Sequence, residues 1–325
     1  MPKDRREVLT DYLRDIHALE EQSLQQMESA PDIAGEPGLA AALREHLEET
    51  RTQEQSLRRL LDERGAEPSR MKDAIMRAGG EGFVLFARSQ PDTPGKLATH
   101  ALSYEALEWA AYDLLERLAV EADEPDVAEV ARAIRDQELE MMRRIESLLA
   151  GTVAASISAR GEDDLDDQLR SYLADAHAIE AQAIVLMEAG RKLTDDPVWS
   201  DLFDKGLAQA RRHQEALEDR LDGLDGSRSA IKDAALRIGG HEWKMFFKAQ
   251  PDTAARYAAF VFAVQYLQIG GFEQLRMVAE RAGDRATEET ARQLVIEDRQ
   301  LAEGLSNAFD RLVTPALSGA ASARD

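Results

Sequence analysis

The chain carries the same sequence pattern twice, and this duplication limits the folds that are open to it. The tetrapeptide Gln-Pro-Asp-Thr occurs at residues 90–93 and again at 250–253, and a glycine pair at 79–80 returns at 239–240. Both pairs are 160 positions apart, since 251 − 91 = 160 and 239 − 79 = 160. A solenoid would repeat at a much shorter interval of roughly 20–50 residues. The constant offset therefore indicates two complete domains in tandem, which we refer to as copy one and copy two.

Composition limits both the class of the protein and its partners. With 325 residues, 44% of them hydrophobic, the chain can bury two cores of ordinary size. Its 62 acidic residues outnumber 40 basic ones and give a formal net charge of −22, which disfavours nucleic acids and anionic membranes as partners. Cysteine is absent, which excludes disulfides, thiolate zinc sites and cysteine nucleophiles. The N-terminal segment is charged and no apolar run reaches about 20 residues, so we expect a cytoplasmic protein.

Apolar residues recur at spacings of three and four through almost the whole chain, which predicts an all-α protein. We expect four long helices in each copy, with a shorter helical segment between the second and the third. The long helices are predicted near residues 7–29, 38–64, 94–122 and 125–149, and near 164–190, 197–222, 252–282 and 284–312. The short segments are predicted near 69–88 and 227–249. The predicted domains are 1–150 and 162–313, with an irregular linker at 151–161 and a flexible tail at 314–325.

Four glutamates in copy one are candidate metal ligands. Glu20, Glu108 and Glu138 each interrupt an apolar stripe near the middle of a predicted helix, and Glu49 lies on the more polar second helix. One such glutamate could simply lie at the flank of its stripe. Four of them converging in one bundle would repel each other strongly, because a buried carboxylate is costly unless it is paired or bound to a metal. A divalent cation or a pair of cations, iron or manganese, would stabilise the cluster.

Three neighbouring residues are secondary candidates in copy one. Glu105 lies one turn before Glu108 and could replace or support it as a ligand. His46 lies three residues before Glu49 and could reach the same face, although a satisfied and partly buried histidine is the competing interpretation. Tyr112 could donate a hydrogen bond to a ligand carboxylate or could belong to the core.

Three segments of copy one carry a resemblance to a known family: Asp15–Gln22, His46–Thr50 and Glu108–Tyr112. They resemble the YciE/YciF family of ferritin-like, stress-associated bacterial proteins. The resemblance extends over each copy in full. It implies a ferritin-like four-helix bundle with an extra short helix, a tendency to dimerise, and a di-metal site. The ligands that it implies are Glu20, Glu49, Glu108 and Glu138.

The chain departs from the usual ferritin-like ligand pattern. That pattern places a histidine three residues after the glutamates of the second and fourth helices. Here Glu49 is followed at that spacing by Thr52, and Glu138 by Met141.

Copy two replaces several of the candidate ligands by neutral side chains. At the 160-residue offset, glutamates 49, 105 and 108 become Gln209, Gln265 and Gln268, and Glu138 becomes Asp298. Glu20 returns as Glu180, while Gln53 becomes His213. We expect a ferritin-like fold with a degraded site, in which these side chains form a hydrogen-bonded network. The open alternative is a residual metal site of Glu180, His213 and Asp298, with Glu297 in reserve.

The sequence leaves two functions open. The first is a ferritin-like, metal-binding stress protein of the di-iron or di-manganese type, with an oxidase or peroxide-scavenging activity implied by the resemblance alone. The second is a non-catalytic structural or interaction module with a vestigial metal site. In both cases we expect the two copies to pack as an intramolecular pseudo-dimer. A homo-oligomer and the presence of enzymatic activity stay open.

Overall fold

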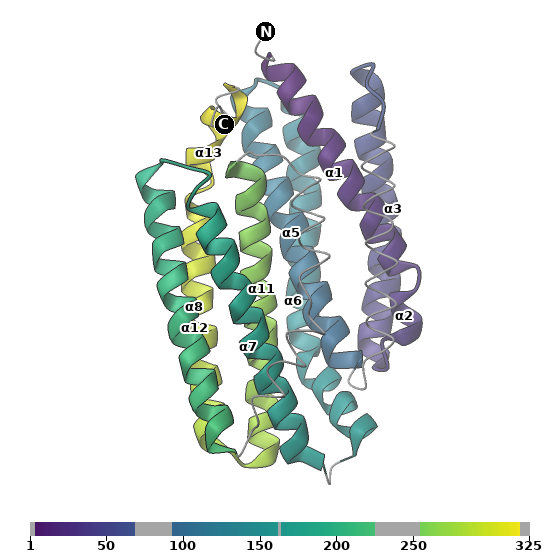
Figure 1. Ribbon diagram of the computed structural model, residues 1–325. Helices are drawn as coiled ribbons and strands as arrows, with labels where there is room; N and C mark the ends of the chain where they lie inside the picture. The colour runs from purple at the N-terminus through teal and green to yellow at the C-terminus, as the bar shows by residue number, and fades with distance from the viewer. Residues whose placement is uncertain (1–3, 69–92, 162–163, 225–253, 319–325) are drawn as a thin grey trace.

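The computed structural model describes residues 4–68, 93–161, 164–224 and 254–318, and these residues form helices joined by short connections (Figure 1). The predicted short segments at 69–88 and 227–249 lie outside the described residues. Copy one contains α1 (Arg5–Met27), α2 (Ala30–Ile33), α3 (Pro37–Glu63), α5 (Thr93–Glu121) and α6 (Pro125–Arg160). Copy two contains α7 (Leu165–Gly190), α8 (Pro197–Gly223), α11 (Ala254–Ala282), α12 (Arg285–Asn307) and α13 (Asp310–Leu317). The predicted all-α fold is confirmed.

Polar and proline residues fix where the long helices begin. Asp4 accepts a hydrogen bond from the Glu7 backbone, and the Glu7 side chain accepts one from Asp4 in return, which forms a capping box at the start of α1. Pro37, Pro125 and Pro197 occupy the first positions of α3, α6 and α8, where the missing amide proton costs nothing.

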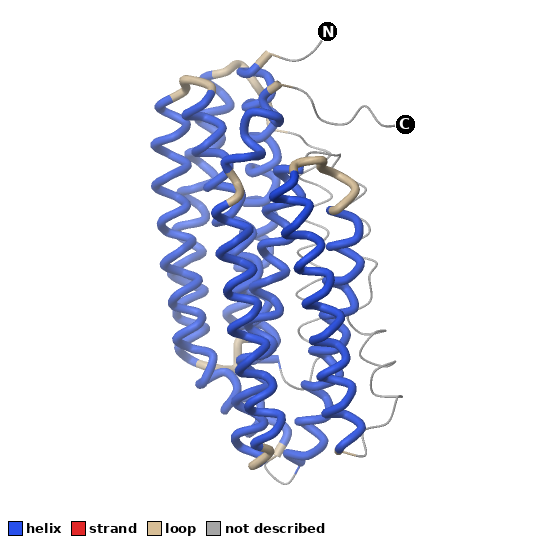
Figure 2. Tube along the Cα trace, turned by 90° about the vertical axis from the view of Figure 1, so that its left-hand side faces the viewer, coloured by secondary structure: helices blue, strands red, loops and turns tan. Residues whose placement is uncertain are grey.

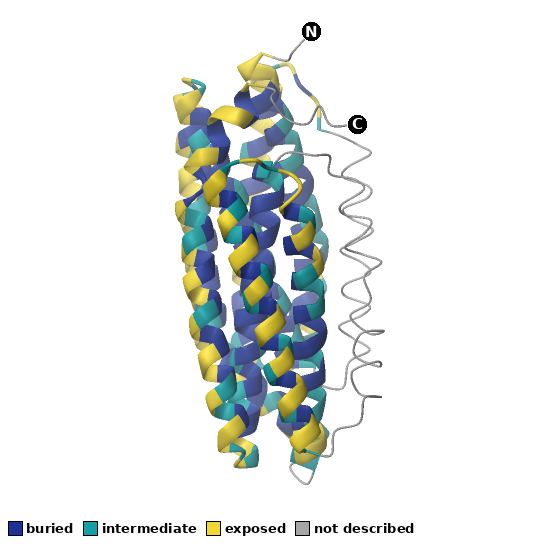
Figure 3. Cartoon of the chain, turned by 60° about the vertical axis from the view of Figure 1, so that its left-hand side comes forward, coloured by how far each residue is buried: buried dark blue, intermediate teal, exposed yellow. Residues whose placement is uncertain are grey.

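The long helices form two bundles that lie side by side. Copy one uses α1, α3, α5 and α6, and copy two uses α7, α8, α11 and α12, with α5 packed against α11 at the centre. The long axes of the helices are roughly aligned with one another (Figure 2). Each outer helix turns its buried face inward and its exposed face to solvent (Figure 3). This amphipathic arrangement is what the spacing of apolar residues predicts.

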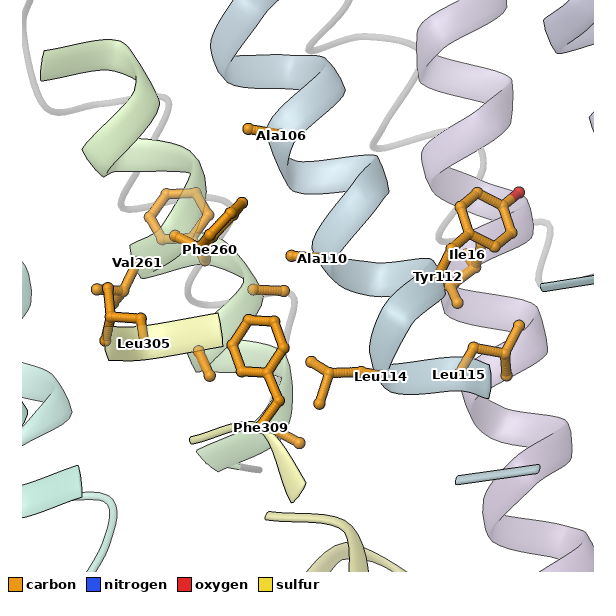
Figure 4. Packing of buried hydrophobic residues seen from close by; sticks show 14 of the residues in the cluster. Ile16, Ala106, Ala110, Tyr112, Leu114, Leu115, Phe260, Val261, Leu305 and Phe309 are labelled. Atoms are coloured by element: carbon orange, nitrogen blue, oxygen red, sulfur yellow. The ribbon is translucent and has the colours of Figure 1, made fainter. Parts of the chain in front are cut away.

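One apolar cluster spans both copies across the contact between α5 and α11, and a second cluster lies within copy two and the end of α6. The ring of Trp109 stacks on Phe262 with ring centroids 4.9 Å apart. Phe309 and Leu114, from opposite copies, also meet in this region (Figure 4). The contact therefore continues the interior of both bundles.

Equivalent residues meet across this contact, so a pseudo-two-fold axis relates the copies. The Ser103 hydroxyl donates to the carbonyl of Ala263, which is its own equivalent 160 positions later. Two ion pairs show the same symmetry. Lys96 Nζ lies 3.1 Å from Asp175 Oδ2, and the equivalent Arg256 pairs with Asp15.

The expected linker at 151–161 is helical as far as Arg160, so this prediction is wrong. Helix α6 runs through it, and the chain turns only at Gly161, whose φ of 98° favours glycine. Val153 and Ile157 lie one turn apart and pack into the core of copy two beside Leu169 and Tyr172. Small residues in this stretch suggest a linker by composition, but the apolar pair gives it a face that copy two buries.

The expected flexible tail is also partly wrong, because residues 310–317 form α13. Helix α12 ends at Asn307, before the predicted end at 312, and α13 begins at Asp310. Leu312, Val313 and Leu317 are buried, and α13 packs on α1, α5 and α11. At the 160-residue offset α13 matches residues 150–157 of α6. Each copy thus places the helical segment that follows its fourth bundle helix on the other copy, as the end of α6 in copy one and as α13 in copy two.

Candidate metal centre

A cluster of buried acidic residues and one histidine occupies the middle of the copy-one bundle. Its members come from three helices: His46 from α3, Glu105 and Glu108 from α5, and Glu138 from α6. One donor atom from each residue lies within 4.8 Å of all the others. All four residues are at most 1% exposed. Glu105 and Glu108 reach the same site because residues three apart share one face of a helix.

Glu20 of α1 lies beside this cluster and is also fully buried. The Tyr112 hydroxyl donates a hydrogen bond to Glu20 Oε1, which fixes the position of the carboxylate. The charges of Glu108 and Glu138 act directly on Glu20. Four carboxylates and one imidazole are therefore gathered in one buried region.

Several oxygen and nitrogen atoms of this region that could bind a metal ion have no hydrogen-bond partner among the described residues. His46 Nε2 lies 2.9 Å from Glu105 Oε2 and 3.3 Å from Glu138 Oε2, yet neither contact has hydrogen-bond geometry. The unpartnered atoms are Glu20 Oε2, His46 Nε2, Glu105 Oε1 and Oε2, Glu108 Oε1, and Glu138 Oε2. Buried polar atoms are normally satisfied, because each unpaired one costs roughly 1–3 kcal/mol. A cation bound between these atoms would satisfy them together.

The pKa shifts of the cluster reflect the burial and close spacing of its charged groups. Burial, followed by the charge of Glu138, raises the pKa of Glu20 well above its usual range. Burial and the charge of Glu20 do the same to the pKa of Glu108. Burial raises the pKa of Glu138 to about 8, even though His46 opposes the shift. Burial lowers the pKa of His46, but the charges of Glu105 and Glu138 outweigh it and raise this pKa well above 6.5.

Glu49 does not join the cluster, contrary to expectation. Its side chain is 48% exposed, and its Oε2 accepts a hydrogen bond from His46 Nδ1 at 2.9 Å. The hydrogen bond from His46 lowers the pKa of the Glu49 carboxyl. The inward face of α3 passes through His46, Thr50 and Gln53, and Glu49 lies at the edge of that face. His46, a secondary candidate in the sequence, therefore contributes the side chain of α3 that reaches the interior.

Gln53 is a member of the site that the sequence did not single out. It is 2% exposed, and its amide donates to Glu138 Oε1 at 2.5 Å and to Gln137 Oε1 at 3.2 Å. It lies seven residues, or two helical turns, after His46, which is the spacing that places both on one face.

Copy two contains a smaller cluster at the equivalent depth. Glu180 of α7, His213 of α8 and Asp298 of α12 are at most 1% exposed, and their donor atoms lie within 4.8 Å of one another. His213 Nδ1 lies 3.1 Å from Glu180 Oε1 and 3.8 Å from Asp298 Oδ1. Gln268 donates to Glu180 Oε1 at 2.8 Å, and Gln209 donates to Asp298 Oδ1 at 2.7 Å. Amides thus hold the carboxylates in place.

The electrostatics of copy two follow the same pattern. Burial, followed by the charge of Glu180, raises the pKa of Asp298 well above its usual range. Burial lowers the pKa of His213, but the hydrogen bond and charge of Glu180 outweigh it and raise this pKa above 6.5.

A third group, His17, Glu21 and Glu54, is already charge-compensated. His17 Nε2 lies 3.0 Å from Glu54 Oε1, and Arg58 Nε donates to the same oxygen at 2.8 Å. The Arg58 guanidinium also lies 3.6 Å from Glu21. Because a guanidinium already pairs with these carboxylates, the group is a poor place for a metal cation.

Comparison with known families agrees with this architecture. A family model described as a domain of unknown function (DUF892) matches residues 4–158 and again residues 164–318. The chain belongs to this family. It is the YciF-like ferritin-like family, so the resemblance seen in the sequence is confirmed, as is the tandem duplication. The gap between the two matches contains Gly161, where α6 ends.

Two further findings bear on the setting of the site. No solved structure matches the chain. Among the described helices, none combines the length and the apolar character that crossing a membrane requires.

Proposed function

We propose that copy one is a ferritin-like centre that binds two divalent metal ions, iron or manganese. The observation that carries the proposal is the set of unpartnered, buried donor atoms from Glu20, His46, Glu105, Glu108 and Glu138. Carboxylates from facing helices are the usual ligands of di-iron and di-manganese bundles.

Charge balance favours two ions over one. The four carboxylates carry a formal charge of −4 when ionised, and His46 is neutral when it acts as a ligand. Two divalent cations offset this charge, whereas one ion would leave two buried carboxylates uncompensated or protonated. The donor set of carboxylate oxygens with one imidazole suits Mn²⁺ and Fe²⁺ better than metals that prefer thiolates.

The supporting residues hold the ligands in orientation. Glu49 accepts the hydrogen bond from His46 Nδ1 and so directs Nε2 inward. Tyr112 holds one oxygen of Glu20 and leaves the other bare. When bound, iron or manganese would supply redox chemistry, and we propose an oxidase or peroxide-scavenging role in a stress response. The residues of the chain would bind and orient the ions and keep bulk water away from them.

Copy two supplies a matched design for the test. Glu105→Gln with Glu108→Gln gives copy one the amides that copy two has at Gln265 and Gln268. After purification without chelator and loading with Mn²⁺, elemental analysis should show that the double variant has lost at least one of the two copy-one ions, because two of the four carboxylates are gone. Its helical content and melting should be retained, because removal of buried charge relieves repulsion. Glu48→Gln, at an exposed position of α3, is the control and should keep both ions.

The alternative function is a non-catalytic structural or interaction module. It is favoured by copy two, where Gln209 and Gln268 donate to the buried carboxylates without any need for a metal. A wild-type protein that binds no Mn²⁺ or Fe²⁺, or a double variant that keeps its ions, would transfer support to this alternative.

A further inference from the structure

We propose that copy two holds a separate site for a single divalent first-row metal ion, bound by Glu180, His213 and Asp298. The site does not depend on the centre proposed for copy one, because it lies in the other bundle and uses a histidine from a different position. Copy one has Gln53 at the position of His213, and copy two has Gly206 at the position of His46.

In both copies a partly exposed carboxylate orients the histidine. His213 Nε2 lies 3.2 Å from Oε2 of Glu297, a partly exposed carboxylate, and Nδ1 faces Glu180 and Asp298. In copy one the partly exposed Glu49 holds the outer nitrogen of His46 in the same way. A carboxylate on the outer nitrogen fixes the tautomer and raises the basicity of the inner nitrogen toward a metal.

The two histidines present different ring nitrogens to the bundle interior. His46 turns Nε2 inward, whereas His213 turns Nδ1 inward. The histidine of copy two thus comes from a position two turns further along its helix and presents its other nitrogen. The space beside Gly206 is filled by Met187 instead, whose Cε and Sδ lie 2.8 Å from where a Cβ at Gly206 would be.

Each carboxylate of the site has one anchored oxygen and one bare oxygen. Gln268 and Gln209 donate to Glu180 Oε1 and Asp298 Oδ1. The second oxygens, Glu180 Oε2 and Asp298 Oδ2, are buried and have no hydrogen-bond partner in the part of the chain that the structure describes. An acceptor that is buried, unpaired and held in place is suited to bind a cation.

The charge of the cluster fits one ion. Glu180 and Asp298 carry a formal charge of −2 when ionised, which one divalent cation offsets. The positions of Glu105 and Glu108 are occupied by Gln265 and Gln268, whose amides hydrogen-bond to each other at 2.7 Å. With these neutral side chains, a second divalent ion would have no compensating charge.

A proton is the competing occupant. In the metal-free protein, His213 Nδ1 is hydrogen-bonded to Glu180 Oε1, so an imidazolium can compensate the same carboxylates. An occupied site would exchange this proton for the metal ion. The two occupants differ in a way that can be measured, because only the metal adds an ion to the protein and gives a spectroscopic signal.

Co²⁺ is the probe, used with the full chain in which Glu105→Gln, Glu108→Gln and Glu138→Gln have disabled copy one, so that Glu20 is the only carboxylate left in its cluster. We expect this variant to bind one equivalent of Co²⁺, with visible absorption bands of nitrogen and oxygen coordination. Adding His213→Gln should abolish that binding and those bands. Copy one naturally carries glutamine at this position, so the substitution suits the fold. His177→Gln is the matched control, since His177 is a buried histidine of copy two that pairs with Glu218 outside the cluster.

The outcomes separate this proposal from the one for copy one. If the disabled variant binds no Co²⁺ while the wild type binds two equivalents, the copy-two site is overturned and the copy-one centre stands. If His213→Gln leaves one equivalent bound with the same spectrum, His213 is not a ligand and the proposal also fails. Circular dichroism monitors folding, and Asp298→Asn provides a second ligand variant should His213→Gln unfold. Loss of the ion in folded Asp298→Asn would support the site, and its retention would contradict it.

Discussion

Glu49 influences the proposed metal centre by orienting His46, and its own carboxylate does not face the cluster. Its Oε2 holds His46 Nδ1 at 2.9 Å, so Nε2 is free to face Glu105 and Glu138. Glu49→Gln should therefore weaken the binding of Mn²⁺ by roughly 10–100-fold without changing the number of ions bound. Isothermal titration calorimetry measures both quantities. A variant that loses ions entirely would show that Glu49 is itself a ligand.

The raised pKa of Glu138 predicts how the stability of metal-free protein depends on pH. The folded protein holds this proton up to about pH 8, whereas an ordinary glutamate loses it near 4.5. Between these values the folded state binds more protons than the unfolded state, so the free energy of unfolding falls as pH rises. Urea melts of metal-free wild type and Glu138→Gln at pH 5 and pH 8 isolate this contribution. The wild type should lose more stability between the two pH values than Glu138→Gln, and an equal loss would contradict the assignment.

At the scale of single residues, the sequence predicts the inward carboxylates of three helices but not the inward residue of α3. Glu20, Glu108 and Glu138 each interrupt an apolar stripe, so periodicity alone places them inside. On α3 the inward face is itself polar, and periodicity does not distinguish His46 from Glu49. Only packing against the neighbouring helices decides between two polar residues that are less than one turn apart.

At the scale of elements, the ends of the two fourth helices determine how the copies are joined. Residues 150–157 of α6 and the equivalent α13 each pack on the opposite copy. Composition does not reveal this, because 150–157 is rich in small residues and 310–317 contains Pro315. Their apolar faces are recognisable only once a partner surface is present. The boundaries of the long helices up to these points follow from prolines and capping residues, which signal where a helix starts.

Ile157 tests whether the end of α6 contributes to the core of copy two. It is 3% exposed and packs with residues of copy two. Ile157→Ala should lower the free energy of unfolding by about 2–5 kcal/mol, because it removes buried methylene groups and leaves a cavity. Urea denaturation measures the change. Ser158→Ala, at the exposed neighbouring position, is the control and should change stability little. Near-wild-type stability of Ile157→Ala would mean that this stretch is a linker after all.

At the scale of the whole molecule, the duplication has produced two bundles with one framework and different interiors. The pseudo-two-fold contact keeps equivalent residues in equivalent roles, as the paired ion contacts of Lys96 with Asp175 and Arg256 with Asp15 show. The interiors differ mainly in charge, because Gln265 and Gln268 replace two glutamates. The molecule therefore combines a symmetric contact between the copies with two chemically distinct centres, one inside each bundle.

The shared core predicts that metal bound in copy one stabilises copy two. A ligand that binds only the native state raises the melting temperature of every segment that unfolds with its site. Trp199 of α8 reports on copy two, because its ring contacts Phe203 and Phe309 and its indole donates to the carbonyl of Ala308. Replacing the other tryptophans with Trp109→Phe and Trp243→Phe leaves it as the single fluorescent reporter. The His213→Gln substitution, added to the same protein, removes the site proposed for copy two.

In that protein, Mn²⁺ should raise the midpoint of the Trp199 transition together with the transition of the whole chain seen by circular dichroism. Packing supports this result, since Phe309 of copy two and Leu114 of copy one belong to one continuous apolar cluster. Adding Glu105→Gln, Glu108→Gln and Glu138→Gln should remove the shift, because only one carboxylate of the copy-one cluster then remains to bind metal. A Trp199 transition that stays in place while the circular dichroism separates into two steps would show that the copies unfold independently. The contact between α5 and α11 would then be a docking surface between two separate cores.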